Sequence, residues 1–143
     1  MVALVLHPDG SPTANSLPGQ VQARYSTPLS FRVPGKLVER RVRLGDTVKA
    51  GQILAMLDQA DLRNDLATAR AQLEAAEHRL AFAKQQLDRD RAQAQANLIA
   101  AAQLEQTQDA YASAVAQRDS AHAQAALVGD RLRYATLVAD HDG

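Results

Sequence analysis

The segment GDTVKAGQILAMLD, residues 45–58, decides the fold of the first half of the chain. Gly45-Asp46 and Gly51 are residue types that favour tight turns, because they tolerate left-handed backbone. The apolar run after Gly51 is typical of a buried strand. The segment therefore predicts a turn, a short strand, a second turn and a longer strand.

The residues before this segment also favour strands. KLVERRVRL at 36–44 contains spaced aliphatic residues, and QVQARY at 20–25 alternates apolar with polar residues. We therefore expect residues 20–57 to form strands, with left-handed backbone at Gly35 as well as at the two later turns. Residues 1–19 are rich in Pro and Gly, which predicts turns with one short strand at 2–6.

The second half of the chain is predicted to be helical. From Gln52 to Val128 there is no Gly or Pro, and Ala, Gln and Leu dominate the helical half. Asp58 suits the N-cap position and Asp61 places a second acid in the first turn. We expect the helical region to span residues 58–133.

Two apolar seams run along this helical region. The first steps by three and four residues until it meets Asp90 and Asn97, and a second seam in a shifted register begins at Leu104. The register change predicts two helices. The first seam is Leu62, Leu66, Ala69, Leu73, Ala76, Leu80, Ala83 and Leu87; the second is Leu104, Thr107, Tyr111, Ala114, Arg118, Ala121, Ala125, Val128 and Leu132.

An antiparallel hairpin centred on Asn97 places large seam residues opposite small ones, which close packing favours. Leu73 then faces Ala121, and Leu80 faces Ala114. The alternative is one continuous helix that pairs with another molecule. We favour the hairpin, with its tip near residues 94–100.

Composition argues against several classes of function. Acidic and basic residues balance at sixteen each and form no basic block, so nucleic acid is not an expected partner. Cysteine is absent, and no array of nucleophile, base and acid recommends an enzyme. The histidines lack metal-ligand spacing, and the segment 140–142 is interpreted as a solvated turn. The apolar run at the N-terminus is too short for a signal peptide or a membrane span.

Two segments resemble periplasmic adaptor proteins, also called membrane fusion proteins, of bacterial tripartite efflux pumps. FRVPGKLVERRVRLGDTVKAGQILAMLD at 31–58 is similar to their first lipoyl half-motif. LRYATLVADHDG at 132–143 is similar to their return sequence, with Ala135 and Asp140 in place of the usual Thr and Pro. The return positions that fit the pattern are Leu132, Tyr134, Leu137, Ala139, Asp142 and Gly143.

The resemblance implies an α+β fold in which a long antiparallel coiled-coil hairpin is attached to half of a lipoyl-like β domain. Residues 20–57 form the first half of that domain and 134–143 return toward its second half, which would follow Gly143. The implied domain is structural and binds no cofactor. A carrier domain would need a lysine after Leu57, where Gln59-Ala60-Asp61 stands instead.

The resemblance also implies partners. In this family the hairpin tip docks on a TolC-like outer-membrane channel, other domains contact an inner-membrane transporter, and hairpins pack side by side. These expectations place the protein in the periplasm, attached to the inner membrane. The candidate tip-binding residues are Arg89, Gln93, Leu98 and Ile99; the family's Arg is kept at Arg89, but Gln93 and Ala100 replace its Leu and Ser. A coiled-coil scaffold unrelated to transport and a biotin or lipoyl carrier are the alternatives.

Half of a lipoyl domain is expected to leave an apolar face without cover. We therefore expect residues 20–57 either to be loosely ordered or to pair with a second chain by domain swapping. The residues expected to lack cover are Val42, Leu44, Val48, Ile53, Ala55 and Leu57.

Overall fold

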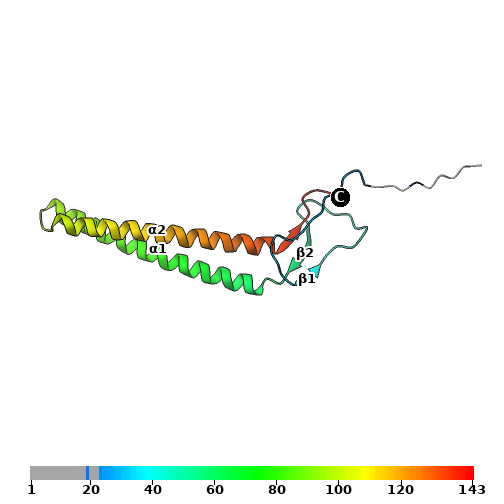
Figure 1. Ribbon diagram of the computed structural model, residues 1–143, viewed down its shortest axis with the longest axis horizontal. Coiled ribbons are helices and arrows are strands. Elements are labelled where there is room, and N and C mark those ends of the chain that lie inside the picture. The colour runs from blue at the N-terminus through cyan, green and yellow to red at the C-terminus, as the bar shows by residue number, and fades with distance from the viewer. Residues whose placement is uncertain (1–18, 20–22) are drawn as a thin grey trace, which may run out of the picture.

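The computed structural model describes Gly19 and residues 23–143, and the strand expected at 2–6 lies outside them. Three short strands and two long helices occur, with the strands gathered at one end of the helices (Figure 1). In chain order they are β1 (Leu37–Arg40), β2 (Ile53–Leu57), α1 (Ala60–Gln95), α2 (Ala101–Tyr134) and β3 (Thr136–Val138).

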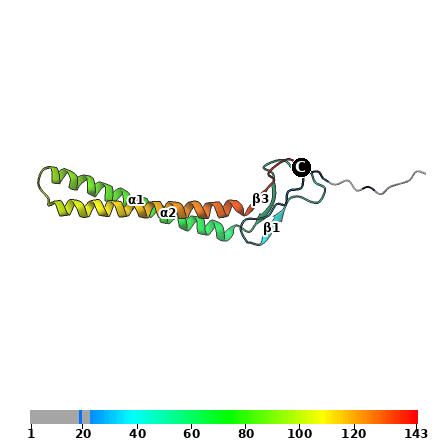
Figure 2. The ribbon, with the colours of Figure 1, turned by 45° about the horizontal axis from the view of Figure 1, so that its top comes forward.

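The two helices form an antiparallel hairpin, which confirms the predicted α+β class. They lie side by side and cross at a shallow angle in both views (Figures 1 and 2). With 36 residues, α1 is roughly 54 Å long at 1.5 Å per residue. Neither helix has a stretch long and apolar enough to cross a membrane.

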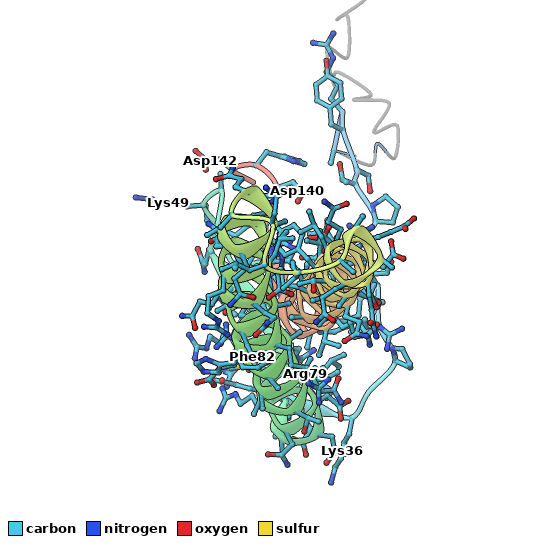
Figure 3. The ribbon with its side chains drawn as sticks, turned by 90° about the vertical axis from the view of Figure 1, so that its left-hand side faces the viewer. Lys36, Lys49, Arg79, Phe82, Asp140 and Asp142 are labelled. Carbon is cyan, nitrogen blue, oxygen red and sulfur yellow. The ribbon has the colours of Figure 1, made fainter. Side chains whose placement is uncertain are left out.

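The hairpin is held by the predicted seams. Every residue of both seams is buried or half-buried, whereas most other helical residues are exposed. Arg79 and Phe82, for example, project from α1 outside the seam (Figure 3). The small seam residues Ala69, Ala76 and Ala114 are at least nine-tenths buried, so the two backbones approach closely at these positions. The narrow interface explains how so few large side chains hold two long helices together.

The strands form an antiparallel sheet in the order β1-β2-β3. Pairing between the return segment and the first half continues beyond the strands, because Ala139 N–H donates to Gln52 O and Gly51 N–H donates to Ala139 O. Val48 and Gly143 exchange two backbone hydrogen bonds at the far end. The buried residues of this region are Ala55, Leu57, Ala135 and Ala139.

The strand predictions need correction in three places. Residues 23–36 form no strand, and the short strand expected between the turns at Gly45 and Gly51 is absent, although Val48 in that segment pairs with Gly143. In addition, β1 ends at Arg40 although the predicted apolar run continues to Leu44. Asp46 explains this early end, because its carboxylate accepts the Arg43 N–H at 2.7 Å and turns the chain away from the sheet. Leu44 is consequently fully exposed.

The start of α1 also differs from the prediction. Gln59, not Asp58, occupies the N-cap position, and it makes no side-chain capping bond. Asp58 still serves the helix end, because its carboxylate accepts the Ala60 N–H at 3.0 Å. Gln59 instead connects the helix to the sheet, since its amide donates to the Thr136 hydroxyl at 2.9 Å.

Candidate functional site

The tip of the hairpin is a tight loop between Gln95 and Ala101. Asn97 has a φ of 57°, the left-handed conformation that asparagine adopts more readily than most residues. The Leu98 N–H donates to Gln93 O and the Asn97 N–H donates to Ala94 O, both at 2.9 Å. This is the Schellman arrangement, and it ends α1 without glycine or proline.

The candidate tip residues lie on and beside this loop. Leu98 is 74% exposed, and Arg89 and Gln93 are also exposed, whereas Ile99 is half-buried. Arg89 and Gln93 are four residues apart on α1 and therefore share a face. The tip thus presents an apolar side chain, a cation and an amide within a short length of the hairpin.

Behind Arg89 a chain of hydrogen bonds crosses to the second helix. The Arg89 guanidinium donates to Gln86 Oε1 at 2.7 Å, and Gln86 Nε2 donates to Asp90 Oδ1 at 2.8 Å. The second Asp90 oxygen accepts the Thr107 hydroxyl at 2.5 Å. Asp90 is only 3% exposed, and the donors from Gln86 and Thr107 provide the hydrogen bonds that a buried carboxylate needs.

A second set of polar contacts connects the return segment to the first half of the chain. The Asp142 carboxylate accepts the Ala50 N–H at 2.7 Å. Ala50 lies between Gly51, which bonds to Ala139, and Val48, which bonds to Gly143, so the Asp142 carboxylate serves here in place of a backbone carbonyl. Figure 3 shows Asp142 near Lys49. At the other end of the segment the Arg32 guanidinium lies 4.0 Å from the centre of the Tyr134 ring.

The predicted turn residues behave in two ways. Gly45 and Gly51 have φ angles of 92° and 79°, where a side chain would strain the backbone, and Asp46 closes the first of these turns. Gly35 differs from the prediction, since its φ is not positive. A Cβ at Gly35 would lie 3.1 Å from Leu57 Cδ1, so glycine allows this loop to cover the buried leucine.

Charge effects in the described residues are modest. Arg41 donates to Glu39 at 2.9 Å on the exposed surface of β1. This hydrogen bond, aided by the attraction of the Arg41 charge, lowers the pKa of Glu39 below its ordinary value. In Gly19 and residues 23–143 no group of three His, Asp or Glu side chains is placed to hold a metal ion.

Sequence reasoning missed the hydrogen bond between the helices from Thr107 to Asp90 and the bond within α1 from Gln86 to Asp90. The available signal was that Asp90 occupies the seam position expected for alanine, one heptad after Ala83, while Thr107 lies on the opposite seam. A polar residue on each of two facing seams indicates a cross-helix hydrogen bond.

Comparison with known proteins gives matches to parts of longer chains, and no known family profile matches this one. A stretch of 56 residues is 46% identical to the UPF0194 membrane protein YbhG of Salmonella typhimurium, covering 39% of this chain and 17% of that protein. A protein from Bacteroides eggerthii described as a candidate efflux transporter is 27% identical, with a TM-score of 0.59 over 80% of this chain and 31% of its own.

Two further solved structures share the fold. ZneB of Cupriavidus metallidurans is 32% identical, with a TM-score of 0.52 over 72% of this chain and 42% of its own. The membrane fusion protein Spr0693 of Streptococcus pneumoniae is 20% identical, with a TM-score of 0.64 over 81% of this chain and 49% of its own. The expected resemblance to membrane fusion proteins is therefore confirmed in fold, and the chain spans less than half the length of each of these relatives.

Proposed function

We propose that this chain is the hairpin and adjoining β region of a periplasmic adaptor that connects an inner-membrane transporter to an outer-membrane channel. The proposal gives the chain no catalytic step and no cofactor. Its role is to span distance and hold its partners in register. The observation that carries it is a narrow hairpin of roughly 50 Å with a small sheet at one end and an ordered tip at the other.

The similarity to proteins described in terms of efflux and membrane fusion supports this proposal. The shape supports the proposal as well, because two long helices packed along a narrow seam form a rod that can span the distance between two partners. Among the described residues, open grooves lie along the hairpin, such as the one between Gln72 and Gln124, and at its base beside Met56 and Arg63. Open grooves of this kind suit lateral contacts better than the enclosure of a small substrate.

We place the contact with the outer-membrane channel at the tip, through Arg89, Gln93, Leu98 and Ile99. The exposed Leu98 side chain can be buried only by a partner, and burial of a full leucine side chain contributes about 1.5–3 kcal/mol. The Arg89 guanidinium makes one hydrogen bond within the described residues, which leaves further N–H donors for acceptors on the partner.

The test uses the full-length protein in cells that depend on it for resistance to an exported compound. Arg89→Ala or Leu98→Asp is expected to reduce export while the protein is made and folded at normal levels. Arg70→Ala is the matched control, because Arg70 is also exposed on α1 but lies more than four turns from the tip. Normal export by a variant that combines Arg89→Ala and Leu98→Asp would refute docking through the tip.

A further inference from the structure

The hydrogen-bond chain beside the tip has a direction that chemistry fixes. Asp90 accepts hydrogen bonds and Arg89 only donates them, so the Gln86 amide between them must point its NH₂ at Asp90 and its oxygen at Arg89. The Thr107 hydroxyl lies 2.5 Å from Asp90 and 3.1 Å from the Gln103 carbonyl oxygen. Its single proton goes to the carboxylate, which is the nearer acceptor and carries the charge.

These hydrogen bonds connect the exposed Arg89 guanidinium to the interior of the hairpin. Among the described residues, Thr107 to Asp90 is the only side-chain hydrogen bond between α1 and α2, and no ion pair joins the two helices. Asp90 and Thr107 are also the last buried residues on each helix before the tip. Rotation or separation of the helices at this end would therefore break the hydrogen bond between Thr107 and Asp90.

Successive hydrogen bonds in a chain of this kind strengthen one another. The buried Asp90 carboxylate polarises the Gln86 amide, which makes Gln86 Oε1 a stronger acceptor for Arg89. The long arginine side chain would otherwise sample many rotamers, and ordering it when a partner binds costs conformational entropy. A guanidinium that is already held avoids part of this cost.

We propose that Gln86, Asp90 and Thr107 are positioning residues that hold the Arg89 guanidinium in one orientation at the tip. The remaining N–H donors of Arg89 are thereby presented to carbonyl or carboxylate acceptors on a partner protein. Because Asp90 is anchored to α2 through Thr107, the orientation of Arg89 depends on the packing of the two helices. The significance of this arrangement for docking rests on the proposed function, whereas the positioning itself can be measured on this chain alone.

The first experiment measures the mobility of the arginine side chains by ¹⁵Nε relaxation in the 143-residue protein. Arg89 is expected to be more ordered than Arg91, which is also exposed and makes no side-chain hydrogen bond within the described residues. Gln86→Met keeps the side-chain size but removes the bonds to Arg89 and Asp90, and Thr107→Val removes the bond to Asp90. Each change is expected to lower the order of the Arg89 side chain to that of Arg91. Thr107→Ser keeps the hydroxyl and is expected to leave the order of the Arg89 side chain unchanged.

The second experiment separates positioning from a general effect on stability. In the full-length protein, Gln86→Met is expected to weaken export about threefold to tenfold, which is the effect of ordering one long side chain only when the partner binds. In an Arg89→Ala background the same change is expected to have no further effect, because it acts through Arg89. An undiminished effect in that background, or an Arg89 that stays ordered in Gln86→Met, would overturn the proposal. If the variant that combines Arg89→Ala and Leu98→Asp left export unchanged, tip docking would fail while the relaxation result would still decide the positioning.

Discussion

At the scale of single residues, Asn97 decides where the first helix ends. Its left-handed backbone lets the Asn97 and Leu98 N–H groups bond back to the last turn of α1. The loop contains no glycine or proline that would end the helix by itself. The left-handed backbone of Asn97, and not only its polar side chain, therefore sets the position of the tip.

Replacing Asn97 tests this role. Asn97→Ala is expected to lower the free energy of unfolding by about 1 kcal/mol, because alanine pays a steric penalty in left-handed backbone. Asn97→Gly is expected to be neutral or slightly stabilising. Urea denaturation followed by circular dichroism measures both, with the exposed Gln95→Ala as the control. Equal stability of the alanine and glycine variants would contradict the assignment of this conformation.

At the scale of the helices, α1 is nearly a repeat of itself. Each heptad places a leucine and an alanine on the seam, from Leu66 and Ala69 to Leu80 and Ala83, and the last heptad replaces the alanine with Asp90. Such a seam packs well but carries little information about register. The β2–β3 pairing fixes the register at the sheet end, and the Asp90–Thr107 hydrogen bond fixes it at the tip end.

The most buried leucine of the seam should dominate the stability of the hairpin. Leu87 is 3% exposed, so Leu87→Ala is expected to lower the free energy of unfolding by about 2–5 kcal/mol through lost burial and a residual cavity. The control is Leu127→Ala on α2, since Leu127 is 48% exposed and should lose less than half as much. Thermal unfolding of both variants gives the comparison, and similar losses would show that the seam is not the main source of stability.

At the scale of the whole molecule, the two ends differ in how much they bury. The hairpin seam is continuous, whereas the sheet region leaves Leu37, Val38 and Leu44 largely exposed. Its described buried core consists of only four residues, three of them alanines. Of the six residues expected to lack cover, only Leu44 is exposed, whereas Val42, Val48 and Ile53 are half-buried and Ala55 and Leu57 are buried. That expectation is therefore wrong for Ala55 and Leu57, which β1, β3 and the loop at Gly35 cover within this chain. Pairing with a second chain stays a prediction.

Amide hydrogen exchange is expected to show this difference. Amides of residues 37–57 should exchange faster than seam amides of α1 and α2, because local opening costs less where few apolar contacts are lost. The measurement needs light scattering on the same sample, since pairing between two chains would protect the sheet. If the protein is a monomer and both regions are equally protected, the sheet is more stable than its burial indicates.

The sequence by itself determined the elements that follow from local pattern and composition. The two seams could be predicted because apolar spacing depends only on helical geometry, and each seam residue is buried or half-buried as expected. The turns at Gly45 and Gly51 could be predicted because glycine is the residue that tolerates their backbone. The residues that carry the family resemblance likewise lie in short contiguous segments.

Only the tertiary structure decided the features that depend on distant residues meeting. The contacts of Asp142 with Ala50 and of Asp90 with Thr107 join residues far apart in the chain. The roles of these carboxylates could not be assigned from sequence, because most aspartates lie on the solvated surface and only the folded chain brings their partners within hydrogen-bond distance.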